Sequence, residues 1–235
     1  MMMRSISVIA IFSAFVLSEG IMAEESALPR VLILGDQIYQ QPATELRKEL
    51  KGKAEVNFPG MKPGEVWNST TALELLDRQI GDGRWDLIHF NCGLGDLIHR
   101  VPGVRSFRVM PRHVGGIRTT DPRQYEKNLH ALVTRLKTTG AKLVWASTTP
   151  IRHSSTNVFA KGTEIEYNAI AAKVMAGHGI PTNDMYVFVK SLIDMNKPAG
   201  HGADPFFFDR KAIHLPLRDI LHKYLGVAPI NLPKS

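Results

Sequence analysis

The chain has 235 residues, a formal net charge of +7 and a single cysteine, Cys92, so it can form no intrachain disulfide and no cysteine-based zinc site. This length suits one domain with a substantial core and is too short for two comfortable ones. The modest positive charge suits acidic small molecules or anionic glycans, and it is weak evidence for nucleic acid.

The first 23 residues have the layout of a secretory signal peptide. Arg4 supplies a positive charge near the N-terminus, and residues 5–17 are largely apolar. Ala23 is a small residue before two glutamates, where cleavage is expected. The alternative, an uncleaved membrane anchor, is disfavoured because the apolar run is shorter than the ~20 residues that span a bilayer. We therefore expect a secreted or periplasmic protein with one domain over residues 24–235, no nucleic-acid partner, and no stable membrane insertion after cleavage.

Short apolar segments bounded by turn residues predict buried parallel strands. They are residues 30–34, 54–58, 85–90, 141–146 and a short fifth within 180–184. Helical periodicity predicts the elements between and after them, at residues 42–50, 71–80, 122–139, 163–175, 184–195 and 217–225. Alternating strands and helices form right-handed βαβ units. The sequence therefore predicts a doubly wound α/β protein, a three-layer α/β/α sandwich with a mainly parallel sheet of roughly five strands in a flavodoxin-like arrangement.

Chemistry-bearing residues follow several of these strands. Gly35-Asp36-Gln37 follows the first strand, Asn91 to Asp96 follow the third, and His214 precedes the last helix. In an open doubly wound sheet, ligands bind at the carboxyl ends of the strands. The sequence thus predicts a site at this edge. Asp36 could belong to that site, or it could only cap the turn that follows the strand.

These segments resemble the blocks of the SGNH (GDSL-type) hydrolase superfamily over essentially the whole mature chain. Residues 31–37 look like the first block, normally Gly-Asp-Ser, and residues 85–96 look like the third, normally Gly-x-Asn-Asp. His214-Leu215-Pro216 is similar to the last block, where Asp-x-x-His supplies a base and its orienting carboxylate. The resemblance implies the SGNH fold and ester hydrolysis, in which the block-one serine attacks and a backbone N–H, a glycine and an asparagine form the oxyanion hole.

The chain departs from that pattern at most chemical positions. Gln37 occupies the position of the nucleophile, and an amide nitrogen is not nucleophilic. Gly95 occupies the position of the block-three asparagine, with Asn91 nearby as a substitute donor. Lys211 stands three residues before His214, so Asp209 is the nearest carboxylate that could orient the imidazole.

Two interpretations remain open. In the first, His214 and Asp209 activate water without a covalent intermediate, while Asp36 and Gln37 position a carbohydrate or carbohydrate-ester substrate. In the second, the protein only binds carbohydrate on the SGNH scaffold. The glycine of the oxyanion hole could be Gly60 or Gly64. We expect no cofactor and no metal, because no spaced histidine pair accompanies an acidic residue.

The irregular stretch from residue 99 to 120 belongs to an arginine-rich segment that extends to Arg123. Arginine binds carboxylate, sulfate and phosphate with a planar fork. Our hypothesis is that this segment overhangs the site and that Arg108 and Arg112 bind an anionic glycan. A charged surface loop is the simpler alternative.

Overall fold

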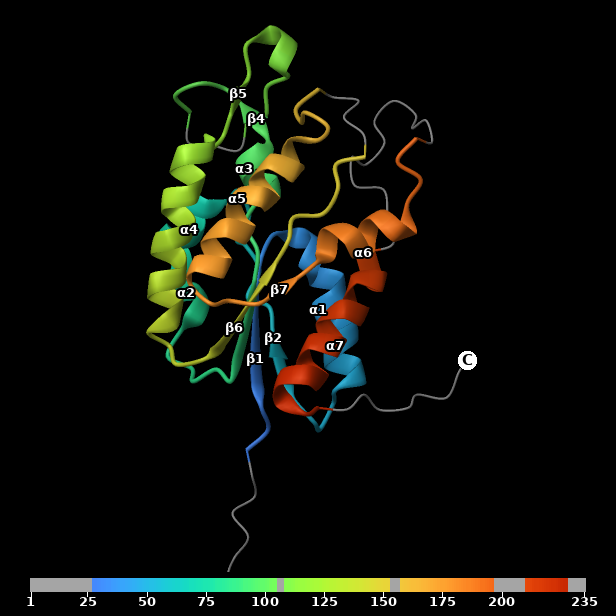
Figure 1. Ribbon diagram of the computed structural model, residues 1–235. Helices are drawn as coiled ribbons and strands as arrows, with labels where there is room; N and C mark the ends of the chain where they lie inside the picture. Colours follow the sequence, from blue (N-terminus) through green and yellow to red (C-terminus); the bar gives the residue numbers. More distant parts are fainter. Residues whose placement is uncertain (1–26, 105–107, 153–156, 197–209, 228–235) are drawn as a thin grey trace, which may run out of the picture.

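The computed structural model describes residues 27–104, 108–152, 157–196 and 210–227. The predicted signal peptide lies outside these residues. The fold is a three-layer α/β/α sandwich around a parallel five-stranded sheet, as predicted (Figure 1). In the described residues, no helix is long and apolar enough to cross a membrane.

The central sheet has the strand order β2-β1-β3-β6-β7. The strands are β1 (Arg30–Leu34), β2 (Glu55–Asn57), β3 (Leu87–Phe90), β6 (Lys142–Ala146) and β7 (Thr182–Asn183). Leu34 pairs with Phe90 and Phe90 pairs with Trp145, so the three central strands end level with one another. The segments that follow β1 and β3 consequently lie side by side.

Helices cover both faces of the sheet (Figure 1). One face carries α2 (Ser69–Ile80), α4 (Pro122–Lys137) and α5 (Thr163–Gly177), and the other carries α1 (Gln40–Glu49), α6 (Met185–Leu192) and α7 (His214–Leu225). Capping residues determine where these helices begin. Asn68 caps α2 by accepting hydrogen bonds from the N–H groups of Thr70 and Thr71, and Asp121 with Pro122 begins α4 in a similar way.

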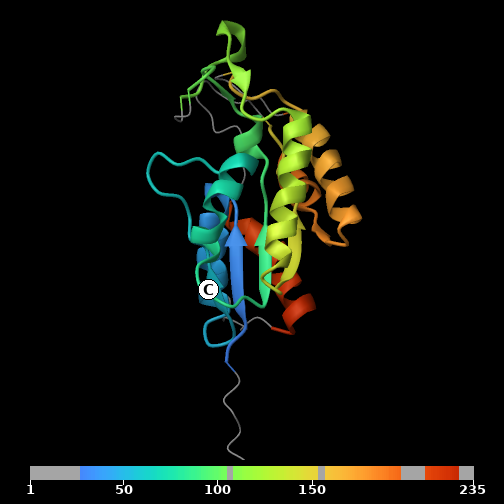
Figure 2. The ribbon, with the colours of Figure 1, turned by 90° about the vertical axis from the view of Figure 1, so that its left-hand side faces the viewer.

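The stretch predicted as irregular contains a two-stranded extension, which we call the arm (residues 98–119, described except for 105–107). The arm contains β4 (His99–Arg100), η2 (Arg112–Val114) and β5 (Ile117–Arg118), and it projects beyond α4 (Figures 1 and 2). Backbone hydrogen bonds from His99 N to Val158 O (2.8 Å) and from Arg112 N to Asn157 O (3.0 Å) fix it to the segment after β6. A short helix, α3 (Leu94–Leu97), connects β3 to the arm.

Candidate functional site

A cavity of about 510 Å³ opens at the carboxyl ends of β1 and β3, where the sequence predicts the site. This volume is within the range of small-molecule binding sites. Three segments and one side chain from the loop before α5 form its wall. The lining residues are Asp36, Gln37, Ile38, Met61, Gly64, Glu65, Val66, Trp67, Leu94, Gly95, Ile98 and Phe159.

Gln37 is exposed at the cavity, and a tight turn holds it there. The Asp36 carboxylate accepts a hydrogen bond from Ile38 N (3.0 Å) and begins the 3₁₀ turn η1 (Gln37–Tyr39). A β-carbon at Gly35 would lie 2.5 Å from the Tyr39 ring, so glycine is needed for the buried ring to pack under the turn. Burial, with the nearby Asp36 charge, raises the pKa of Tyr39 well above its usual value. Asp36 thus has the capping role, and it also lines the cavity.

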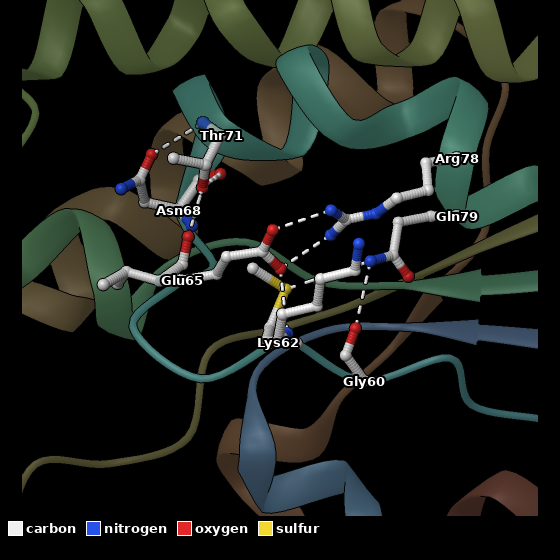
Figure 3. A network of polar contacts seen from close by, with 9 residues as sticks. Gly60, Lys62, Glu65, Asn68, Thr71, Arg78 and Gln79 are labelled. Carbon is white, nitrogen blue, oxygen red and sulfur yellow. Dashed lines mark hydrogen bonds and ion pairs between the residues drawn. The ribbon is translucent and has the colours of Figure 1, made fainter.

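The loop between β2 and α2 forms one wall and is braced against α2. The Glu65 carboxylate accepts two 2.6 Å hydrogen bonds from the fork of Arg78 and one from Lys62 N (2.8 Å), as Figure 3 shows. The bonds from Arg78 and then from Lys62 lower the pKa of Glu65 to about 2, so it is ionised at neutral pH. Gln79 donates to Gly60 O (3.0 Å) and fixes the start of the loop. Gly64 lines the cavity, whereas Gly60 does not.

Gly95 packs against the same loop at very short range. A β-carbon at position 95 would lie 1.9 Å from the backbone oxygen of Trp67. The Trp67 indole is 4% exposed and donates to Asn91 O (2.6 Å), which fixes this backbone in place. The space in which an asparagine side chain would begin is therefore occupied by the main chain.

Asn91, the predicted substitute donor, lies under the cavity instead of lining it. Its side-chain amide donates to Ala146 O (2.8 Å) and to Thr148 Oγ1 (3.3 Å), and the residue is 1% exposed. Both amide hydrogens are thus engaged between β3 and β6.

Asp96 anchors the N-terminus of α2 from inside the protein. The fully buried carboxylate accepts from Ser69 Oγ (2.6 Å) and Ser69 N (3.0 Å), and Asn128 donates to the same Ser69 hydroxyl (2.9 Å). Burial raises the pKa of Asp96 to about 6, although the hydrogen bonds from Ser69 oppose this shift. The block-three aspartate therefore joins α3, α2 and α4 at the back of the cavity wall.

The predicted base lies beside α1 and is not among the residues that line the cavity. His214 Nε2 is 3.4 Å from Glu49 Oε2, and Arg218 also contacts that carboxylate at 3.6 Å. The turn η3 (Arg210–Ile213), which precedes His214, packs against η1 and α1. Asp209 lies outside the described residues.

The two predicted arginines belong to the arm and do not line the cavity. Arg112 donates from Nη2 to Asn157 Oδ1 (2.8 Å), which holds the arm to the body, whereas Arg108 is exposed to solvent. Among the described residues that line the cavity, Asp36 and Glu65 are the only charged ones. Within the described part of the chain, no three side chains form a cluster suited to a metal ion.

No family model and no curated protein matches this sequence. The fold, however, is similar to that of solved esterases. The acetyl xylan esterase AlAXEase matches with a TM-score of 0.61 and 15% identity over 82% of this chain and 99% of that chain. The lipase/acylhydrolase from Enterococcus faecalis matches with a TM-score of 0.61 and 12% identity over 87% of this chain and 100% of that one.

A GDSL-like lipase from Bacteroides thetaiotaomicron matches with a TM-score of 0.56 and 14% identity, over 83% of this chain and 88% of that chain. At these identities the comparison concerns the fold and not the activity. The chain has the fold of the SGNH (GDSL-type) hydrolases.

Proposed function

We propose that this chain binds a carbohydrate or a carbohydrate ester in the cavity, without the acyl-enzyme chemistry of a serine esterase. The main support is the contact between Gly95 and Trp67. A β-carbon at position 95 would lie 1.9 Å from the Trp67 oxygen, so the main chain of the wall occupies the space that an asparagine side chain would need. Gln37, at the position of the nucleophile, supplies an amide that can donate and accept hydrogen bonds but cannot attack a carbonyl.

The charge of the wall favours a neutral, hydroxyl-rich ligand. Among the described residues that line the cavity, Asp36 and Glu65 are the only charged ones, and both are acidic. Ligand hydroxyls can donate to Glu65, whose pKa of about 2 keeps it ionised. No described lining residue is cationic, so the described wall offers no direct counter-charge to an anionic group. The solved acetyl xylan esterase, whose fold is similar, makes xylan-derived sugars the first ligands to test.

The test is calorimetric titration with xylo-oligosaccharides, their acetylated forms and oligogalacturonates. We expect binding of the neutral or acetylated sugars, and about 2- to 10-fold weaker binding by Gln37→Ala, the loss of a typical neutral hydrogen bond. Gln40→Ala is the matched control, because Gln40 is exposed three residues further on and does not line the cavity. Equal affinities for both variants, or no binding of any sugar, would contradict the proposal.

Hydrolysis without a covalent intermediate is the second candidate. It is favoured by the contact of η3 with η1, which brings the chain just before His214 next to the turn that carries Gln37. In this mechanism, His214 activates water against an ester bond.

Acetate release from acetylated xylo-oligosaccharides separates the two candidates. If the protein hydrolyses esters through His214, His214→Ala abolishes release while His222→Ala, an exposed histidine of α7, retains it. Sugar binding with no acetate release from the wild type rejects this second candidate and retains the first.

A further inference from the structure

The arm has a charge composition unlike the rest of the chain. Residues 98–119 contain five arginines, two histidines and no aspartate or glutamate, although the whole chain has 22 acidic residues. Arg112 is engaged with Asn157 and Arg118 lies 3.7 Å from Glu166. Arg108 is exposed and, among the described residues, contacts no acidic side chain. The surface of the arm is therefore cationic and complementary to an anionic partner.

The same arm exposes aliphatic side chains to water. Val104 (40% exposed), Val109 (43%), Val114 (54%) and Ile117 (54%) make up half of the eight exposed large hydrophobic residues in the described chain. Exposed hydrophobic residues concentrated on one short extension commonly mark an interaction surface. A partner for the arm must therefore satisfy both arginine and branched aliphatic side chains.

The shape of the arm favours a flat partner. It projects beyond the end of α4 (Figures 1 and 2), so an extended surface can approach it before meeting the helices. Ile98, at its base, is the only described residue of the arm that lines the cavity. These features fit a lipid surface better than a polysaccharide.

We propose that the arm binds the surface of an anionic phospholipid bilayer. Arg108 contacts the headgroup phosphates, and the exposed aliphatic side chains enter the boundary between headgroups and acyl chains, as in peripheral interfacial segments. Binding of this kind is peripheral and requires no membrane-spanning helix. It does not depend on which ligand occupies the cavity.

The test is sedimentation of the full chain with vesicles of phosphatidylcholine alone and of phosphatidylcholine mixed with phosphatidylglycerol. We expect binding to the anionic vesicles only, and weaker binding as salt screens the charges. Arg108→Glu should weaken it by at least about fivefold, since it reverses one surface charge. Ile117→Asp should weaken it further at any salt concentration, because a buried aliphatic contact is lost.

Two exposed residues outside the arm give matched controls, Arg84→Glu and Val187→Asp, the latter at a position that is 59% exposed on α6. Both should bind like the wild type, and thermal melts check that every variant folds. The proposal is overturned if anionic vesicles do not bind, or if Ile117→Asp binds them as well as Val187→Asp does. It is also overturned if the arm variants lose binding to heparin or polygalacturonate while vesicle binding is unchanged, which would identify an anionic polysaccharide as the partner.

Discussion

The backbone oxygen of Trp67 lies where a side chain at Gly95 would begin, 1.9 Å from the position of a β-carbon. This contact joins α3 to the loop before α2, and it explains why the cavity wall tolerates only glycine at position 95. Because the clash is with main-chain atoms, no rotation of a flexible side chain can relieve it.

Replacing Gly95 with Asn should destabilise the protein. Overpacking of this kind typically costs about 1–3 kcal/mol, and for a chain of this size each kcal/mol lowers the melting temperature by about 2–4 °C. Gly177→Ala is the matched control, because a β-carbon there meets nothing within 4 Å. Thermal denaturation of both variants checks the prediction, and an unchanged melting temperature for Gly95→Asn would show that the loop moves freely.

Restoring a serine at position 37 should not restore an esterase. The position-95 donor is absent, and removal of one oxyanion-hole donor alone typically slows acyl transfer by about 10²–10³-fold. We expect Gln37→Ser to hydrolyse p-nitrophenyl acetate no faster than Gln40→Ser, its exposed control. A burst of nitrophenol from Gln37→Ser alone would mean that another group replaces the missing donor.

The ion pair between Glu65 and Arg78 should determine how rigid the cavity wall is. Glu65→Gln removes the carboxylate that accepts hydrogen bonds from Lys62 N and from both Nη atoms of Arg78. We expect faster amide hydrogen exchange at residues 62–67, with exchange in the central strands unchanged. Arg78→Lys keeps the charge but loses the bidentate fork, so it should give an intermediate effect. Equal exchange in all three proteins would show that the loop is held by other contacts.

Much of the fold could be predicted because its elements are marked locally. Residues 31–34 and 143–146 are apolar throughout, as strands buried on both faces must be, and they lie in β1 and β6. The arm was harder to predict because each of its strands has only two residues. A segment this short shows no alternation of apolar and polar residues that would indicate a strand.

The cavity wall could not be predicted from pattern alone. Trp67 and Gly95 meet through a loop without periodicity, and neither residue type indicates the contact. Glu65 and Phe159 were not predicted as site residues, although the Gly60–Gly64 turn at the end of β2 is a signal for the loop that carries Glu65. His214 was placed by its resemblance to a family block. Its contact with Glu49 arises from the packing of α7 on α1, which no local signal near His214 reveals.

Asp96 should make the protein less stable as the pH rises from about 4 to about 6. Its pKa is about 6 in the folded protein and about 3.9 in an unfolded chain. The folded state therefore holds the proton more tightly, and the stability contributed by protonated Asp96 is fully present below about pH 4. It is lost as the pH rises through 6, by about 3 kcal/mol in total. Asp96→Asn cannot titrate, so its free energy of unfolding relative to the wild type should rise by about this amount between pH 4 and pH 7.

Comparing wild type and Asp96→Asn by urea denaturation across this range separates Asp96 from other buried titrating groups, of which His89 in β3 is one. Burial lowers the pKa of His89 to about 3, below its unfolded value of about 6.5, so His89 makes the folded protein less stable as the pH falls through the same window. The two effects have opposite signs, so they partly cancel when the free energy of unfolding of the wild type is measured against pH. The difference between wild type and Asp96→Asn removes the contribution of His89, and Asp82→Asn, in the exposed turn after α2, serves as the matched control. If the difference in free energy of unfolding between wild type and Asp96→Asn stays constant with pH, the pKa of Asp96 is the same in the folded and the unfolded chain. The prediction would then be wrong.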